Sequence, residues 1–461
     1  MATTLTSRHS NTSGSPLLGH PEGPQEPRLV TESSPSNVRV RLALLAIALG
    51  PLSFGFHIGE LNSPQAVIST CSTEPSDNPS SLHSLPECIP MPEAQYASIV
   101  AILTIGGLVG SLLAGVVSGS RKRVALINAA ILLGGSLLTG LASSPAQMLY
   151  GRFLSGMGIG VVAVMAPIWL VHIAPPDLRG AFGTVNQLGI VLGILLAQVF
   201  GLYLSTPSLW RYILLFPALL ALLQIFLLPL TPDSHLYPTS LGALLQPARR
   251  RALITTVSLQ IGQQGSGINA VMFYSTSILS TIFPNSAALV SLLISIANVG
   301  VTLVAARILD RLGHRQLLVG SSMTTSLVLL VLAASLAFNW ALTSAVAIIL
   351  FVCTFAIGLG PIPFLAAPAL VDPEAAGAVQ SLGLAANWIG GFIIGSAFLG
   401  IRSAIGEWIW VLFSIVCVGV AFLGSIALPP STKNPLPSDG LIPNDDDDEE
   451  GEEEEGVPQH V

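Results

Sequence analysis

The chain has 461 residues, of which 51% are hydrophobic and only 9% are charged, and its mean hydropathy is +0.72. Soluble domains are about 25% charged, so this composition excludes a soluble globular protein and indicates an integral membrane protein. The net charge of −7 arises near the C-terminus, because the segment from Asp445 to Glu455 contains ten of the 25 acidic residues.

Both ends of the chain are polar. Residues 1–41 are rich in Ser, Thr and Pro and lack the apolar stretch of a signal peptide, so we expect a disordered cytoplasmic segment. Residues 431–461 form an acidic tail whose like charges repel one another, which also predicts disorder. This tail is a candidate binding segment for a cytosolic partner. Residues 16–18 (Pro-Leu-Leu) are similar to a dileucine sorting signal, so the expected location is the plasma membrane or a vacuolar or other internal membrane.

Between these ends the chain contains apolar stretches of about 20 residues, which is the length that crosses a bilayer as a helix. Six lie in the first half of the chain, near 42–62, 97–118, 124–142, 148–172, 184–204 and 212–230. Six more lie in the second half, near 253–279, 287–308, 316–336, 341–366, 378–400 and 407–428. The fold prediction is therefore an all-α membrane protein with twelve transmembrane helices.

The positions of Lys and Arg predict the orientation, because these residues are concentrated in cytoplasmic loops. With both termini cytoplasmic, all but three of the 18 Lys and Arg residues fall on the inner side; the exceptions are Arg152, Arg211 and Arg402. An odd number of spans would scatter the basic clusters over both sides.

Two short loops recur at equivalent places in the two halves of the chain. Residues 176–181 after the fourth span match residues 373–378 after the tenth, and the basic loop 120–123 matches 310–315. This pattern predicts two related six-helix halves, 42–230 and 252–430, joined by a short cytoplasmic linker at 231–251. In such an arrangement the substrate site lies between the halves near the membrane midplane.

The main outer loop, residues 63–96, carries Cys71 and Cys88. Because the outer side permits disulfides, we expect these two residues to be bonded, with two unrelated thiols as the alternative. Cys353 and Cys417 lie inside spans and are interpreted as small apolar residues.

Uncharged polar residues are concentrated inside several spans, and the densest set is residues 263–270 of the seventh span. Gln260, Gln263, Gln264 and Gly267 follow helical spacing, so one face of that span is polar. Neutral amides bind hydroxyl groups without a counter-charge, which suits a polyol. The alternative is interhelical hydrogen bonding, but the amides recur in matched spans of both halves at Gln187, Gln198, Asn298 and Asn387, the last beside Trp388.

These features favour a carrier and not an enzyme, because no group of residues meets the requirements of a catalytic site. The expected partners are a small sugar and the lipid bilayer. We expect no nucleic-acid partner, no cofactor and no metal.

Several motifs resemble the sugar porters of the major facilitator superfamily, the group that contains the facilitative glucose transporters. The most specific is the run from Gln263 to Ser275 in the seventh span. The resemblance covers roughly residues 42–433, is closest to fungal members in the first span, and also includes 55–57, 62–65, 151–154, 179–184, 187–190, 360–363 and 387–388.

This resemblance implies the fold of that superfamily and alternating access by rocking of one half against the other. It also implies the residues that contact the sugar. They are Gln187, Gln263, Gln264, Asn269, Asn298 and Asn387, with Trp388 nearby and with Phe364 where many glucose carriers have Trp.

The chain departs from the family at the residues that couple transport to protons. Proton-coupled members usually have Asp at the position of His57, facing the Arg that matches Arg152, and His with Arg cannot form that salt bridge. Glu60 lies one turn further along the same face. We therefore expect uniport, with proton symport through His57 and Glu60 as the alternative.

The family's cytoplasmic ion pairs are also largely lost. His172 replaces the usual Glu after the fourth span, and Ala369 and Ala376 replace charged residues around the tenth. The remaining gating candidates are Arg179, Asp310, Arg311 and Arg315. Loss of these pairs predicts a shift toward the inward-open state.

The function predicted from the sequence is transport of a monosaccharide, a hexose such as glucose, across a membrane. A non-transporting sugar sensor or trafficking factor is the alternative, because the cytoplasmic ion pairs are weakened and the acidic tail is available to a partner.

Overall fold

The computed structural model describes residues 37–71, 85–174, 179–231, 233, 235–236, 244–280 and 286–429. The dileucine-like motif and the acidic tail lie outside these residues. The first helix, α1, begins at Asn37, so the last five residues of the segment predicted to be disordered are helical. The linker expected at 231–251 is likewise shortened, because a helix already begins at Pro247.

The first bundle is built from helices that precede residue 231. They are α1 (Asn37–Gly59), α2 (Gln65–Ser69), α3 (Glu93–Val116), α4 (Arg121–Gly140), α5 (Pro145–Ile173), α6 (Arg179–Leu204), α7 (Trp210–Leu227) and the 3-10 helix η2 (Leu228–Leu230). The second bundle comprises α9 (Pro247–Gly265), α10 (Ile268–Ser280), α11 (Ala287–Ala337), α12 (Ala341–Ile357), α13 (Ile362–Leu370), α14 (Pro373–Ile405) and α15 (Trp408–Ala427).

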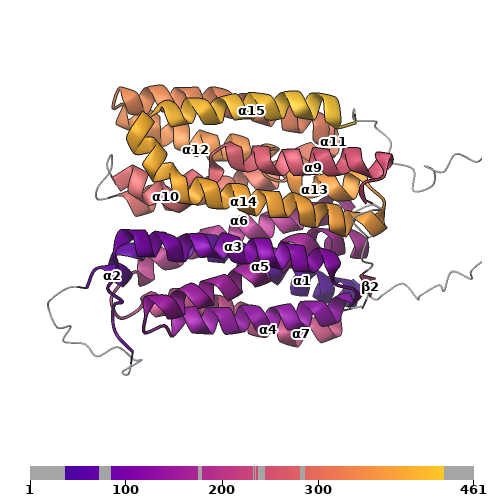
Figure 1. The fold of residues 1–461 in the computed structure, drawn as a ribbon, viewed down its shortest axis with the longest axis horizontal. Helices are drawn as coiled ribbons and strands as arrows, with labels where there is room; N and C mark the ends of the chain where they lie inside the picture. Colours follow the sequence, from indigo (N-terminus) through magenta and orange to yellow (C-terminus); the bar gives the residue numbers. More distant parts are fainter. Residues whose placement is uncertain are drawn as a thin grey trace, which may run out of the picture.

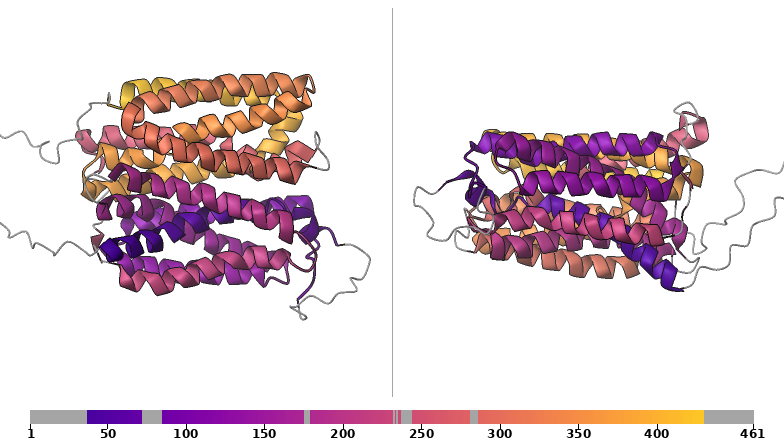
Figure 2. Two further views of the ribbon diagram at one scale, coloured as in Figure 1. Left: turned by 180° about the vertical axis from the view of Figure 1, so that it is seen from behind. Right: turned by 90° about the horizontal axis from the view of Figure 1, so that it is seen from below.

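The two bundles lie one against the other along their length (Figure 1), and the same stacking is seen from behind and from below in Figure 2. Helix α3 packs along α14 and α6 packs along α11, so these pairs join the bundles. Figure 1 places α2 at one end of the molecule, here called the α2 end, and β2 at the opposite end, the β2 end.

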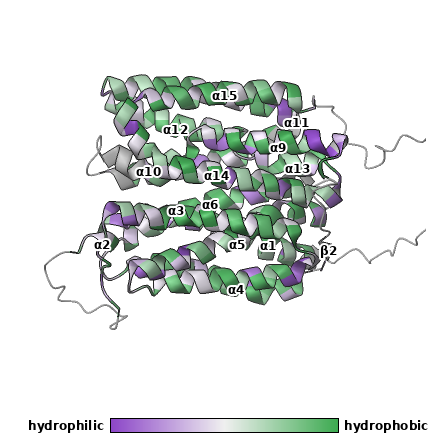
Figure 3. Cartoon of the chain, in the orientation of Figure 1, coloured by the Kyte–Doolittle hydropathy of each residue, from purple (hydrophilic) through white to green (hydrophobic). Residues whose placement is uncertain are grey.

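Ten helices among the described residues are long and apolar enough to cross a membrane. The stretch Leu289–Ala305 is apolar but shorter, and the pair α9–α10 covers the span predicted at 253–279. The structure is therefore consistent with the twelve predicted spans. Apolar residues cover the outer surfaces of both bundles (Figure 3), as contact with lipid requires.

Two predicted spans are broken helices. Gly267, with a φ of 84°, separates α9 from α10, and residues 358–361 separate α12 from α13. A positive φ is accessible to glycine at little cost, whereas a residue with a Cβ atom is strained there. Irregular backbone at membrane depth is tolerated where it is buried in protein or lines a cavity.

At the β2 end, the segments after α3 and α7 are joined by a short two-stranded sheet. Strand β1 (Gly119–Ser120) pairs antiparallel with β2 (His235–Leu236). The Ser120 hydroxyl donates to a carboxylate oxygen of Asp233 at 2.6 Å, and the backbone N–H of Lys122 donates to the other at 3.1 Å. An acid at this position satisfies free N–H groups at the start of α4.

Candidate functional site

A central cavity lies between the two bundles, with a volume of about 800 Å³ when the space open to solvent is included. Its lining residues come from both halves of the chain. The cavity therefore lies between the halves, where the sequence predicts the substrate site. Its lining includes all eight residues predicted to contact substrate: Gln187, Gln263, Gln264, Asn269, Asn298, Phe364, Asn387 and Trp388.

Apolar side chains complete the cavity, and the sequence prediction missed them. Phe54 and Ile58 come from α1, and Ile190 and Ile194 from α6. An apolar residue suits both a lipid-facing and a cavity-facing position of a span. The sequence therefore could not distinguish these four residues from those that face lipid.

An amide cluster joins α9, α14 and the break between α12 and α13. The Asn387 amide donates to the side-chain oxygens of Gln260 and Gln263, at 2.8 Å each, and Gln264 donates to the Asn387 oxygen at 2.9 Å. Gln260 is completely buried, and it belongs to the polar face expected in this span although it was not predicted as a site residue. Interhelical hydrogen bonding and cavity lining therefore occur in the same cluster.

The break at Gly267 determines where Asn269, another predicted site residue, lies. A Cβ atom at Gly267 would lie 2.3 Å from the ring of Phe413, so both the backbone conformation and the close packing require glycine. Helix α10 restarts at Ile268, and Asn269 in its first turn lines the cavity.

Trp388 of α14 lines the central cavity where the two halves meet. Its ring lies against Gly107 of α3, where an added Cβ atom would come within 2.6 Å of the indole. The ring centroid of Trp388 is 5.5 Å from that of Phe54 on α1, with the planes tilted by 46°. Phe364 of α13 lines the same cavity and is 9% exposed.

Three ionisable residues of the first half form a buried cluster apart from the central cavity. Glu60, Arg152 and His57 are each 1% exposed, and a single carboxylate oxygen of Glu60 contacts both Arg152 and the His57 ring. Arg152 also donates to the backbone oxygen of His57 at 3.0 Å. His57 does not form the salt bridge of the family with Arg152, and Glu60, directly after the end of α1, supplies a carboxylate to that guanidinium instead.

A second cavity of about 980 Å³ extends toward the α2 end. It shares Ile58 and Phe273 with the central cavity and is also lined by Asn62, Gln65 and Glu93. The central cavity and this second cavity are therefore neighbours that share part of their walls.

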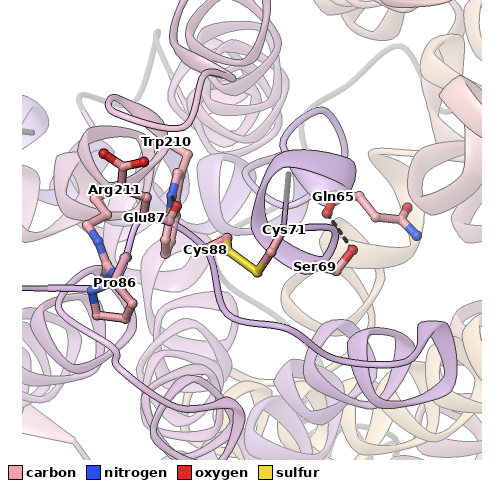
Figure 4. The surroundings of a disulfide bond; sticks show 8 residues. All are labelled: Gln65, Ser69, Cys71, Pro86, Glu87, Cys88, Trp210 and Arg211. Atoms are coloured by element: carbon pink, nitrogen blue, oxygen red, sulfur yellow. Dashed lines mark hydrogen bonds between the residues drawn. A yellow bond between two sulfur atoms is a disulfide. The ribbon is translucent and has the colours of Figure 1, made fainter. Parts of the chain in front are cut away.

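The predicted disulfide is present at the α2 end, where Cys71 and Cys88 are bonded with their Cα atoms 5.6 Å apart. Figure 4 shows Trp210 and Arg211 of α7 beside the bonded segment. The Trp210 indole N–H donates to the Glu87 backbone oxygen at 2.6 Å. Arg211 donates to the Pro86 oxygen, also at 2.6 Å.

At the β2 end the halves meet through small residues. The Ser381 hydroxyl on α14 donates to the Ser111 backbone oxygen on α3 at 2.6 Å, and Ala375 and Ala376 are buried. Among the gating candidates, His172 is exposed and Arg315 is half-buried, and neither lines the central cavity. The side chains of Arg179, Asp310 and Arg311 lie outside the described part of the structure.

An ion pair at the β2 end lies within the second half of the chain. Arg249 at the start of α9 donates two hydrogen bonds of 3.0 Å to the carboxylate of Asp372, which precedes α14. Because both partners belong to the same bundle, this pair does not replace the lost contacts between the halves. In the part of the chain that the structure describes, no group of three or more His, Cys, Asp or Glu residues could hold a metal ion.

Sequence comparisons agree with this architecture. The family model described as "Sugar (and other) transporter" matches residues 42–246 and 238–437. Human facilitated glucose transporter member 4 of solute carrier family 2 is 34% identical over 449 residues, which cover 84% of this chain and 87% of the relative. A probable metabolite transport protein of Saccharomyces cerevisiae is 31% identical over 435 residues, which cover 81% of this chain and 89% of the relative.

Solved structures show the same fold. The proton:xylose symporter XylE bound to 6-bromo-6-deoxy-D-glucose superposes with a TM-score of 0.68 at 17% identity, covering 84% of this chain and 95% of XylE. The inward-open conformation of XylE from E. coli gives 0.65 at 18% identity, covering 85% and 97% of the two chains. The chain belongs to the sugar transporter family of the major facilitator superfamily, whose members are transporters and not enzymes.

Proposed function

We propose that this protein carries a monosaccharide, a hexose such as glucose, by alternating access of the central cavity to the two sides of the membrane. The observation that carries the proposal is the set of neutral amides that line the cavity from both halves, including Gln187 from α6 and Gln264, Asn298 and Asn387 from the second half. Amides donate and accept hydrogen bonds at once, which matches the hydroxyl groups of a sugar.

The charge of the site supports the same substrate class. Within the described residues, no charged side chain lines the central cavity. An ionic substrate in a membrane interior needs a counter-charge, whereas a neutral polyol needs hydrogen-bonding groups and an apolar wall. The names of the human relative, a glucose transporter, and of XylE, a xylose symporter, support a sugar as the substrate.

In this proposal the α2 end faces the outside and the β2 end faces the cytosol, so both termini are cytoplasmic. The disulfide between Cys71 and Cys88 supports this orientation, because disulfides persist in oxidising compartments. The basic residues Arg121, Lys122 and Arg123 lie at the opposite end, as the positive-inside rule requires. The membrane is the plasma membrane or an internal one, which a fluorescent fusion in the native cell distinguishes.

Uptake of radiolabelled hexoses by the purified protein in liposomes tests the substrate proposal. We expect saturable uptake that Gln264→Ala and Asn269→Ala reduce strongly. Gln198→Ala is the matched control, because Gln198 is a buried amide on α6 that does not line the central cavity. Binding of hexose without uptake would favour the sensor, whereas uptake unchanged in both site variants would refute the assignment of the site.

For the mode of transport we propose uniport, with proton symport as a second candidate that one observation favours. That observation is the buried ion pair of Glu60 with Arg152. Glu60 provides the carboxylate that proton-coupled members usually have at the position of His57. In uniport, uptake down a hexose gradient persists after a protonophore collapses the proton gradient and causes no proton movement. Proton entry that accompanies hexose and disappears in Glu60→Gln would establish symport.

A further inference from the structure

Ser381 on α14 makes a close contact with α3 of the other half of the chain, toward the β2 end. Its hydroxyl donates to the Ser111 backbone oxygen at 2.6 Å, and both serines are buried. A Cβ atom added at Gly115, four residues further along α3, would lie 2.6 Å from the Cβ atom of Ser381 and closer still to its Oγ atom. The two helices therefore touch here, and no side chain larger than that of glycine fits at Gly115.

This contact belongs to a longer line of contacts between α3 and α14, which lie side by side in Figure 1. Gly107, Ser111 and Gly115 are four residues apart, so they share one face of α3. On α14, Trp388 rests against Gly107 and Ser381 rests against Gly115. We call these five residues the α3–α14 seam. It extends from the central cavity, which Trp388 lines, toward the β2 end.

The seam lies on the closed side of the central cavity. Toward the α2 end, the central cavity shares Ile58 and Phe273 with the second cavity. A third cavity of about 510 Å³, with the space open to solvent included, lies at the β2 end and is lined in part by Gly115. Among the described residues, the third cavity shares none of its lining with the central one. The seam therefore separates the central cavity from the β2 end.

The seam has the chemistry that holds helices together in a membrane. Small residues let two helix backbones approach closely, and hydrogen bonds between helices add to the packing. A backbone oxygen has two lone pairs, so Ser111 can accept from Ser381 as well as within its own helix. Separation of α3 from α14 would break this bond, and an interaction made in only one of two states shifts the population toward that state.

We infer that Ser381 is a positioning residue that keeps the β2 end closed, through its hydrogen bond to Ser111 and its fit against Gly115. This neutral contact takes the place of the family's lost cytoplasmic ion pairs and favours the state open to the α2 end. Ser381 does not line the central cavity, so it acts without touching the substrate. The inference rests on the proposed function, because it assumes alternating access. The competing explanation is an ionic contact between Arg121 and Glu374, which line the third cavity from opposite halves.

The rates at which introduced cysteines react with a water-soluble maleimide report the two states. Ala378→Cys places a reporter in the third cavity, and Val100→Cys places one in the second cavity, toward the α2 end. Each reporter is made in the full-length protein with Cys353 and Cys417, the free cysteines of the described residues, changed to Ser. The measured quantity is the rate at the β2-end reporter divided by the rate at the α2-end reporter. A generally loosened fold would raise both rates, whereas a shift between states changes their ratio.

Ser381→Ala should raise this ratio about three- to fivefold, which is the worth of one hydrogen bond between helices. Gly115→Ala should raise it further, because the new methyl group also forces the helices apart. Addition of Ser381→Gly to Gly115→Ala removes both atoms that the methyl group would meet. The double variant should therefore return to the ratio of Ser381→Ala, a rescue that nonspecific damage to the fold does not predict.

Two matched controls come from the same helix. The Ser396 hydroxyl is exposed and donates to the backbone oxygen of Phe392 within α14, so Ser396→Ala should keep the wild-type ratio. At Gly377, near the β2 end, nothing lies within 4 Å of an added Cβ atom, so Gly377→Ala should keep it as well.

The inference is overturned if Ser381→Ala and Gly115→Ala both fold and keep the wild-type ratio. It is also overturned if Arg121→Gln or Glu374→Gln raises the ratio as much as Gly115→Ala does, since the closing contact would then be ionic. Ser381→Val, which adds bulk from the other side of the contact, repeats the test if Gly115→Ala does not fold. The labelling requires no sugar. Absence of hexose uptake by the wild-type protein would therefore overturn the proposed function, whereas the labelling ratios judge the role of Ser381.

Discussion

Glu60, directly after the end of α1, is paired with Arg152 on α5 in the interior of the first bundle, and each side chain is only 1% exposed. The same carboxylate oxygen accepts from the His57 ring at 2.9 Å. Arg152 therefore has an acidic partner although His57 stands where the family usually has Asp, and that partner is three residues further along the chain, just beyond α1.

Glu60→Gln should destabilise the protein, because Arg152 would remain buried without a counter-charge. Removal of one partner of a buried ion pair typically costs about 3–5 kcal/mol, and we expect the lower end because glutamine can still accept a hydrogen bond. The midpoint of thermal unfolding in detergent should fall clearly. Glu93→Gln, which changes an exposed acid at the start of α3, should change it little. An unaltered midpoint in Glu60→Gln would show that the pair contributes nothing to stability.

Cys71→Ser should reduce stability through the loss of the disulfide with Cys88. The bonded residues are 17 apart in sequence, and closure of a loop of that size is worth about 3 kcal/mol in the chain-entropy model. The thermal midpoint should fall by the same amount in Cys88→Ser and in the double variant. A further fall in the double variant would mean that the two cysteines act independently.

Gly267→Ala should disrupt the junction between α9 and α10. The left-handed conformation costs a residue with a Cβ atom about 1–2 kcal/mol, and the new methyl group would also overlap the ring of Phe413. Folding yield and hexose uptake should both fall. In the control Gly300→Ala, nothing lies within 4 Å of the added atom, so stability should be kept or slightly raised. Equal behaviour of the two variants would contradict the assigned conformation of Gly267.

Gly107→Ala should weaken substrate binding while the protein still folds. The added methyl group would meet the indole of Trp388 at 2.6 Å, so the ring must move toward the cavity or away from Phe54. We expect the KM for hexose to rise several-fold with a smaller change in kcat. Gly134→Ala on α4, where no atom lies within 4 Å, is the matched control and should keep the wild-type KM. An unchanged KM in Gly107→Ala would show that the position of Trp388 does not matter for transport.

The sequence by itself determined the membrane class, the helical fold and the polar residues of the cavity. Hydropathy over about 20 residues reports whether a segment can lie in lipid, and this property is local. Amides such as Gln264 and Asn387 stand out because polar groups are rare inside spans. The Cys71–Cys88 bond was predictable because both residues lie in the loop 63–96, which the sequence predicts to be on the outer side.

Only the tertiary structure decided which groups meet. Glu60 and Arg152 are 92 residues apart in the chain, and no local pattern shows that a carboxylate one turn from the expected position still reaches the same guanidinium. The Gln263 amide donates to the backbone oxygens of Leu359 and Gly360 between α12 and α13, and side-chain patterns in the sequence do not report such contacts with the backbone of a helix break. The packing of Trp388 on Gly107 arises where the two bundles meet. These relations depend on distances between remote segments, so they emerge only when the whole chain is folded.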